Sequence, residues 1–282
     1  MEIIKADYLS TCFGVENALS IAYRSLEYVD NLYCYGELIH NNDVMDELKS
    51  KGLKVIENIE DINDGHLIIR SHGVAKSIYD YCQNQGITII DATCPKVKYI
   101  HKIVEKYCND DYNIIVFGNP SHPEVQGIVG WCHQPVAVFK NLQAYLSSEF
   151  RHMKKQAIVF QTTYNTNDYK VIKEYFKNHS NDDIILNSTI CHATELRQDA
   201  VQRLARECDS ILIIGGKQSS NTKKLYEISK EICEQTFWIE NSKDIPYNLI
   251  KNSKKLGITA GASTPSQIVE EVIFNVRKES NA

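Results

Sequence analysis

The chain has no long apolar run and no export signal. No stretch approaches the roughly 18 apolar residues that a membrane-spanning helix needs, so we expect no association with a membrane. The first residues, Met1 to Lys5, lack the basic and then apolar order of a signal peptide. We therefore expect a cytoplasmic protein in a reducing compartment, where its nine cysteines do not form a disulfide framework.

Closely spaced cysteine pairs are also absent. None of the nine cysteines belongs to a Cys-x-x-Cys pair. This excludes zinc ribbons, thioredoxin-type dithiols and the usual ferredoxin cluster signature. A metal site in this chain would have to gather its ligands from distant segments.

The composition carries no strong bias. The net charge of −5 argues against a general nucleic-acid binder, and there is no low-complexity segment or Pro/Gly-rich linker. With 43% hydrophobic and 24% charged residues among 282, the chain is typical of a globular protein with two or three tightly packed small domains.

The chain alternates short β-branched runs with amphipathic helical stretches. We expect strands at 67–69, 87–90, 114–117, 157–160, 184–186, 211–214 and 257–260, and helices at 97–107, 200–207 and 268–276. Strands this apolar, alternating with helices, predict buried parallel sheets in an α/β protein.

Three cysteines follow such runs with a threonine one or two residues before them, and these are Cys12, Cys94 and Cys191. A polar residue stands 28 residues after each cysteine, and these are His40, His122 and Ser219. The sequence therefore indicates three copies of one structural unit. We predict units at 12–93, 94–190 and 191–282, with residues 1–11 packing near the third.

Functional side chains of open α/β sheets collect at the carboxyl ends of strands. Nine such positions fall into three groups: Cys12, His40 and His72; Cys94, His122 and Thr162; Cys191, Ser219 and Ser263. Thiolates suit iron–sulfur clusters, zinc and copper(I). Three of them on a cubane cluster would leave one iron open to bind a substrate oxygen as a Lewis acid.

The alternative interpretation of each cysteine is an ordinary core residue. We prefer that interpretation for the six others, Cys34, Cys82, Cys108, Cys132, Cys208 and Cys233, because they lie in helix-like or core patterns. It does not account for three cysteines at matched offsets.

The polar groups around the predicted site suit a multiply charged anion. His40, His72 and His122 follow apolar runs beside turn-forming residues, where imidazoles can bind anions. The segments 214–222 and 261–265 combine glycines with hydroxyls at predicted helix starts, although the first is neither a P-loop nor a G-x-G-x-x-G motif. Together they predict a diphosphate site. We expect His101, His152 and His179 on the surface and leave His192, next to Cys191, undecided.

Glu124 lies two residues after His122. A carboxyl group beside an anion in a partly dry site has a raised pKa, which favours a role as proton donor. Without that context it is a glutamate in a loop.

These residues resemble the 4-hydroxy-3-methylbut-2-enyl diphosphate reductase family, which catalyses the last step of the non-mevalonate isoprenoid pathway. The resemblance runs nearly end to end and is carried by short motifs at 39–41, 71–74, 91–95, 122–125, 161–163, 191–198, 219–222 and 261–263. It implies a pseudo-threefold trefoil of three α/β units around one [4Fe–4S] cluster per chain, with three cysteine ligands, Cys12, Cys94 and Cys191, and one open iron.

The resemblance also implies a role for each polar group. The diphosphate would be held by His40, His72, His122, Ser219, Ser220, Asn221 and Ser263. Glu124 matches the proton-delivering acid, and Thr162 matches the hydroxyl beside the substrate alcohol, with Thr163 next to it as the alternative. The family removes the allylic hydroxyl as water with two electrons from a reduced ferredoxin or flavodoxin type donor, giving isopentenyl and dimethylallyl diphosphates.

One segment departs from the family pattern. The residues before Cys12 lack the basic and glycine residues that usually surround the first cysteine, while Gly14 and Val15 remain. Two other functions stay open from the residues alone: a different open-iron cluster enzyme such as a hydro-lyase, and a non-enzymatic cluster sensor. A zinc site formed by three cysteines and a histidine would require a colourless, iron-free protein.

Overall fold

The computed structural model describes residues 1–62, 64–179 and 183–280. The chain divides into two compact units. Unit 1 contains Met1–Val15, His40–Val44 and His192–Ala282, and unit 2 contains Glu16–Ile39 and Met45–Cys191. Among the described residues, no helix is long and apolar enough to cross a membrane.

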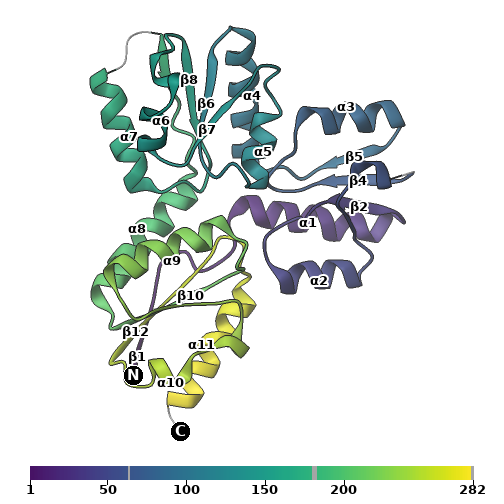
Figure 1. Cartoon of the computed structure of the whole chain (residues 1–282). Helices are drawn as coiled ribbons and strands as arrows, with labels where there is room; N and C mark the ends of the chain where they lie inside the picture. Colours follow the sequence, from purple (N-terminus) through teal and green to yellow (C-terminus); the bar gives the residue numbers. More distant parts are fainter. Residues whose placement is uncertain (63, 180–182, 281–282) are drawn as a thin grey trace. The chain divides into compact units, whose positions relative to one another are not determined.

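Within the described residues, the strands form three parallel sheets of four strands each (Figure 1). Unit 1 holds the sheet β1-β12-β10-β11, with β1 Glu2–Lys5, β12 Lys255–Ala260, β10 Ser210–Ile214 and β11 Thr236–Ile239. Unit 2 holds β5-β4-β2-β3, with β5 Thr88–Asp91, β4 His66–Ile69, β2 Leu32–Tyr35 and β3 Lys54–Ile56. It also holds β9-β8-β6-β7, with β9 Ile184–Leu186, β8 Gln156–Phe160, β6 Asn113–Phe117 and β7 Ala137–Phe139.

Helices connect the strands and cover the sheets. The helices are α1 Phe13–Tyr28, α2 Asn42–Ser50, α3 Lys76–Gln85, α4 Pro95–Asn109, α5 Pro123–Val129, α6 Leu142–Leu146, α7 Thr166–His179, α8 His192–Glu207, α9 Ser220–Ile232, α10 Tyr247–Ile250 and α11 Ser266–Ser280. Short 3₁₀ turns lie at Ile59–Asp61, Glu149–His152 and Ser242–Asp244. All strands and helices expected from the sequence are present, and the α/β class with parallel sheets is confirmed.

Side chains point alternately to the two faces of each sheet, and this explains why helices cover both faces. In β6, Ile114 and Val116 pack against α4 and α5, while Ile115 and Phe117 pack against α6 and α7. Successive side chains of a strand point to opposite faces, so a strand buried on both faces must be continuously apolar. In the unit 1 sheet, α11 covers one face and α8 and α9 cover the other.

The shared strand order places the predicted functional residues at equivalent positions. The edge strands β1, β5 and β9 lead to Cys12, Cys94 and Cys191. The strands β10, β2 and β6 lead to Ser219, His40 and His122, and the strands β12, β4 and β8 lead to Ser263, His72 and Thr162. In each sheet, three strands at matching positions therefore each lead to one predicted site residue.

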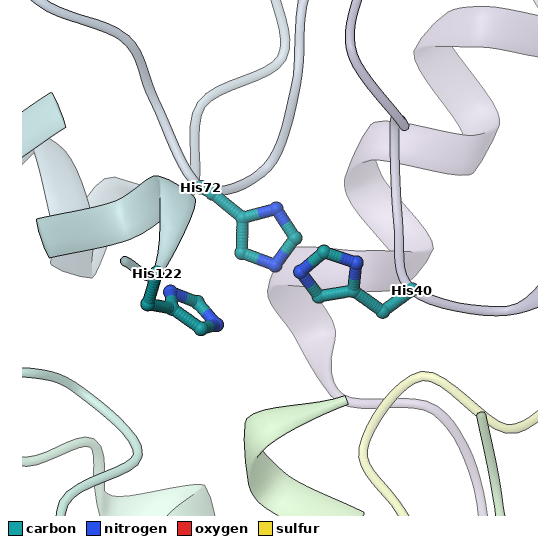
Figure 2. Close-up of side chains that lie close together, drawn as sticks. All are labelled: His40, His72 and His122. Atoms are coloured by element: carbon teal, nitrogen blue, oxygen red, sulfur yellow. The ribbon is translucent and has the colours of Figure 1, made fainter. Parts of the chain in front are cut away.

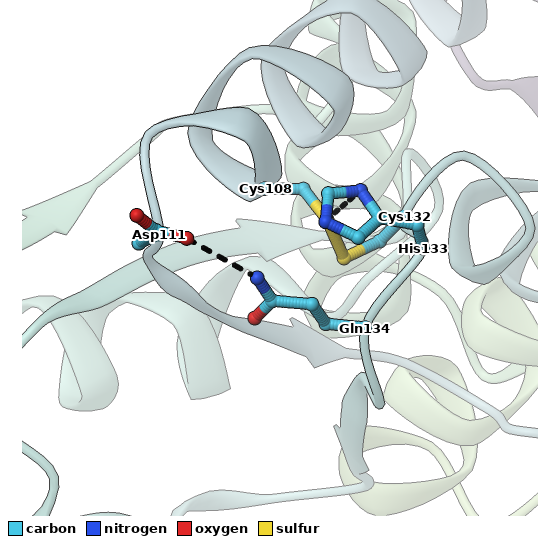
Figure 3. The surroundings of a disulfide bond; sticks show 5 residues. All are labelled: Cys108, Asp111, Cys132, His133 and Gln134. Atoms are coloured by element: carbon cyan, nitrogen blue, oxygen red, sulfur yellow. Dashed lines mark hydrogen bonds between the residues drawn. A yellow bond between two sulfur atoms is a disulfide. The ribbon is translucent and has the colours of Figure 1, made fainter.

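One pair of cysteines departs from the expectation that the remaining six are unbonded core residues. Cys108 and Cys132 form a disulfide (Figure 3). The interpretation as free core thiols is wrong for this pair, because α4 and the segment after α5 bring the two sulfur atoms together. It is confirmed for Cys34, Cys82, Cys208 and Cys233, which are free and buried.

Candidate active site

Each of three cysteines stands immediately before a long helix. Cys12 precedes α1, Cys94 is the N-cap residue of α4, and Cys191 precedes α8. Their backbone N–H groups donate, each over 3.0 Å, to carbonyls that follow the neighbouring strand: Cys12 to Ala262, Cys94 to Ser71 and Cys191 to Thr162. All three are free thiols of intermediate burial. The threefold repeat in the sequence is therefore also a repeat in local structure.

A helix N-terminus suits the ligands of a negatively charged centre. The first N–H groups of a helix have no partner within it, and the aligned peptide dipoles leave partial positive charge there. Each of the three thiols has one such helix start beside it. These positions are favourable for cysteine thiolates that bind a soft metal or an iron–sulfur cluster.

A buried arginine holds the chain before Cys12. Arg197 lies on α8 and is 4% exposed, and its guanidinium donates to the carbonyl of Ser10 over 2.6 Å and to that of Ala193 over 3.2 Å. Arg197 belongs to the motif at 191–198, but the sequence did not predict its contact with Ser10. Its contact with Ser10 positions the segment that departs from the family pattern.

Glu124 and Thr162 form a closed pair in unit 2. The backbone N–H of Thr162 donates to Oε1 of Glu124, and its hydroxyl donates to Oε2, both over 2.6 Å. Glu124 is 2% exposed, so almost no water reaches the carboxyl group. Burial raises the pKa of Glu124, and the two hydrogen bonds from Thr162 oppose that rise without cancelling it. Burial thus favours the protonated carboxyl group, whereas the hydrogen bonds from Thr162 favour the ionised one.

The neighbouring threonine points elsewhere. The hydroxyl of Thr163 accepts a hydrogen bond from the side-chain amide of Gln161 over 3.0 Å. The carbonyl oxygen of that amide accepts from the backbone N–H of Asn119 over 3.0 Å. Of the two threonines considered from the sequence, Thr162 is thus the one bonded to Glu124.

Two of the predicted anion-binding histidines lie together in unit 2. The rings of His72 and His122 have centroids 5.5 Å apart in an edge-to-face arrangement (Figure 2). His122 is the N-cap residue of α5, and its Nδ1 accepts from the backbone N–H of Glu124 over 3.1 Å. Since Nδ1 accepts, a neutral His122 carries its proton on Nε2, where it can donate to an anion.

The loop that carries His72 rests on a buried histidine, which the sequence did not predict. His101, expected on the surface, is 2% exposed, because α4 turns it toward the loop after β4. It stacks on Trp131 with centroids 4.9 Å apart. Gly73 has φ +71°, and a Cβ there would lie 2.5 Å from Cε1 of His101, so only glycine fits. By contrast, His152, His179 and His192 are exposed.

The remaining predicted anion-binding groups lie in unit 1. Ser219 caps α9 and accepts from the N–H of Thr222, so Ser220 and Asn221 form the first turn of that helix. The side-chain oxygen of Asn221 accepts from the N–H of Ala262 over 3.0 Å, while its buried Nδ2 donor has no partner. The hydroxyl of Ser263 donates to the carbonyl of His40 over 3.0 Å.

Glu124 and Asn221 occupy equivalent positions in their sheets. Glu124 lies two residues after His122, which follows β6, and Asn221 lies two residues after Ser219, which follows β10. Each also accepts the backbone N–H of the loop that bonds a cysteine: Thr162 in one case and Ala262 in the other. An amide oxygen performs this structural task at Asn221. The carboxyl group at Glu124 is therefore not needed for the fold of its loop.

Comparison with known proteins identifies the family. The family model described as LytB protein matches residues 3–277. The chain belongs to the LytB family. Both compact units fall within this LytB match, apart from the first two and last five residues.

Two relatives of this LytB chain carry the same name. A protein from Alkaliphilus oremlandii is 44% identical over 279 residues, covering 98% of this chain and 99% of the relative. A protein from Clostridioides difficile is 42% identical, covering 97% and 98%. Both are named 4-hydroxy-3-methylbut-2-enyl diphosphate reductase.

Solved structures agree with this assignment to the LytB family. The E-1-hydroxy-2-methyl-but-2-enyl-4-diphosphate reductase from Plasmodium falciparum superposes with a TM-score of 0.91 at 28% identity, covering 97% of this chain and 87% of that one. A structure of (E)-4-hydroxy-3-methyl-but-2-enyl diphosphate reductase matches with a TM-score of 0.69 at 35% identity, covering 99% and 100%.

Proposed function

We propose that this chain is a 4-hydroxy-3-methylbut-2-enyl diphosphate reductase of the cytoplasm. The reaction consumes two electrons and two protons, removes the allylic hydroxyl as water, and yields isopentenyl and dimethylallyl diphosphates. The observation that carries the proposal is the threefold repeat of a free cysteine before a helix, combined with a buried Glu124–Thr162 pair. Membership of the LytB family and the names of its relatives support it.

LytB proteins are iron–sulfur enzymes. We propose that Cys12, Cys94 and Cys191 hold one [4Fe–4S] cluster with one iron open. The residues fit this group, since all three are free thiols at positively polarised helix starts. When bound, the cluster supplies the electrons and a Lewis-acidic iron for loss of the hydroxyl group. The division into units at 12–93, 94–190 and 191–282 is part of this proposal, and the common strand order of the sheets supports it.

The remaining polar groups bind and orient the substrate. In this proposal the diphosphate is held by His40, His72, His122, Ser219, Ser220, Asn221 and Ser263. These groups offer imidazole, hydroxyl, amide and helix N-terminal donors, which suit phosphate oxygens. Holding the diphosphate fixes the position of the allylic alcohol. The entropic cost of orienting the alcohol then falls on substrate binding and not on the reaction step.

Glu124 then serves as the proton donor. Its raised pKa keeps the carboxyl group protonated at a pH where an exposed glutamate is ionised. The hydroxyl of Thr162 is bonded to that carboxyl group. When the carboxyl group is protonated, the hydroxyl accepts its proton and passes its own to the leaving oxygen.

An anaerobic assay tests the function. Cluster-reconstituted protein is mixed with reduced viologen dye, and dye oxidation is followed after addition of 4-hydroxy-3-methylbut-2-enyl diphosphate. We expect two dye molecules oxidised per substrate consumed, with no oxidation when either protein or substrate is omitted. Water loss without dye oxidation would instead indicate a hydro-lyase, and no turnover by an intact cluster protein would indicate a sensor.

We further propose an acidic ferredoxin or flavodoxin as the electron donor. The helix α4, which has Cys94 as its N-cap residue, exposes Lys96, Tyr99, Lys102 and Lys106 along one face. Its one acidic residue, Glu105, is engaged by Lys76 over 2.5 Å. In a chain of net charge −5, this basic stripe offers an acidic partner a docking face next to a proposed cluster ligand.

Charge reversal on α4 tests the docking face. The triple variant Lys96→Glu, Lys102→Glu and Lys106→Glu is expected to raise KM for an acidic ferredoxin by about tenfold at low salt, because steering is lost. Dye-driven turnover should not change. The matched control reverses Lys170, Lys173 and Lys177, which are exposed on α7, with the same change in net charge. Equal effects of the two triple variants would remove α4 from donor binding.

A further inference from the structure

The disulfide between Cys108 and Cys132 joins two elements that contribute to the candidate site. Cys108 lies in the last turns of α4, whose first turn follows Cys94. Cys132 lies three residues after the end of α5, which carries Glu124 in its first turn. The Cα atoms are 5.6 Å apart. Cys108 is fully buried, whereas Cys132 is partly exposed, so a reductant can reach the bond only from the side of Cys132.

The segment beside Cys132 holds the loop of His72. The indole N–H of Trp131 donates to the carbonyl of Val74 over 3.0 Å, and its ring stacks on His101. His101 in turn occupies the space above Gly73, the residue after His72. A bond that anchors Cys132 to α4 therefore also restrains Trp131 and, through it, the backbone that presents His72.

A second cysteine pair shows that the bond is not a general consequence of the fold. Cys208 follows α8 and Cys233 follows α9, the helices that correspond in the unit 1 sheet to α4 and α5. Both are free, and the thiol of Cys233 donates to the carbonyl of Asp209 over 3.4 Å. The equivalent positions thus hold a bonded pair in one sheet and two buried thiols in another.

We propose that Cys108 and Cys132 form a reversible redox-modification site, which a dithiol protein reduces and whose state sets how firmly Trp131 holds the His72 loop. Disulfides that persist in reducing compartments are usually transient or redox-sensing rather than structural. The bond is reachable at Cys132, and an imidazole lies beside the buried sulfur (Figure 3): Nδ1 of His133 is 3.4 Å from Sγ of Cys108.

The exchange balances with a dithiol as the two-electron donor. A thiolate of the dithiol attacks Sγ of Cys132, the S–S bond breaks, and a mixed disulfide forms. The thiolate of Cys108 leaves beside Nδ1 of His133, which stabilises it by a hydrogen bond, and then takes a proton from solvent. The second thiol of the dithiol then loses its proton to solvent and attacks the donor's sulfur in the mixed disulfide. Cys132 is released as a thiolate that takes up a proton, and the donor is left oxidised as a disulfide.

The sequence allows this pair to be followed without interference from the proposed cluster ligands. No lysine or arginine lies between Lys106 and Lys140, so trypsin releases residues 107–140 as one peptide with only these two cysteines. Cluster-loaded protein is equilibrated anaerobically in dithiothreitol buffers of graded potential, quenched in acid, labelled with a maleimide and digested. We expect two labels to be lost together along one transition, with a tenfold change in ratio for about 30 mV.

Three further measurements decide the rest of the proposal. Thioredoxin with its reductase should shorten the reduction time by roughly tenfold relative to an equal concentration of glutathione. His133→Asn should slow that reduction. Amide hydrogen exchange at residues 71–76 should be several-fold slower, roughly threefold to tenfold, in the oxidised protein than in the reduced protein or in Cys132→Ser. The control variant Cys233→Ser should leave that exchange unchanged.

Each of the following results would contradict one part of the redox proposal. Two labels on the peptide at every potential would show that no disulfide forms. Reduction no faster with thioredoxin than with glutathione would exclude a dithiol protein as the reductant. Equal exchange of residues 71–76 in both states, or an equal change in Cys233→Ser, would exclude control of the His72 loop.

Discussion

Replacing Cys94 with serine is expected to remove most of the iron and sulfide bound per chain and to abolish dye-driven turnover. A serine hydroxyl is a poor ligand for iron in place of a thiolate. Serine is, however, a favourable N-cap residue, so α4 should keep its first turn. The loss is therefore that of a ligand and not of the helix. Iron and sulfide analysis, visible absorption and far-ultraviolet circular dichroism separate the two.

The matched control for Cys94→Ser is Cys82→Ala. Cys82 is a free, fully buried cysteine on α3 with no role in the proposed site. This variant removes one sulfur atom from the core and should keep its iron, at a modest cost in thermal stability. Wild-type iron content and turnover in Cys94→Ser would contradict the three-cysteine cluster.

Replacing Glu124 with glutamine is expected to lower turnover by about 10²–10⁴-fold, the usual effect of losing a general acid. The affinity for the diphosphate substrate should change by no more than about threefold, because the mutation removes an interaction of the reaction step. The loop of Thr162 should survive, since the amide of Asn221 accepts the equivalent backbone N–H in unit 1. Single-turnover kinetics and calorimetric titration with substrate measure the two quantities.

The pH profile identifies the proton donor. Burial raises the pKa of Glu124, so its protonated form persists to a higher pH than in an exposed glutamate. Turnover should fall as the pH rises through that raised pKa, and this limb should be absent in Glu124→Gln. The control Glu174→Gln changes an exposed carboxylate on α7 and should preserve both turnover and profile. An unchanged turnover in Glu124→Gln would remove Glu124 from its role.

Local patterns in the sequence predicted the elements and their chemistry. Runs such as 114–117 and 211–214 are apolar at every position, and only a strand buried on both faces tolerates this, so β6 and β10 could be inferred without coordinates. The offset of 28 residues after Cys12, Cys94 and Cys191 is likewise a property of the chain. Both signals are short-range or periodic, and neither depends on how distant segments pack.

The tertiary structure decided which of several similar side chains meet. Thr162 and Thr163 are adjacent hydroxyls, and only the contact with Glu124, 38 positions earlier, separates their tasks. His101 is polar and lies on an amphipathic helix, yet Gly73 and Trp131 bury it. In the sequence, Cys108 and Cys132 do not differ from the other core cysteines. Only the packing of α4 and the segment after α5 brings them together. The sequence by itself determined the α/β class, because that follows from local hydrophobicity and covalent order, and it predicted the residue types of the candidate site. Pairings between distant segments depend on packing that no local pattern encodes.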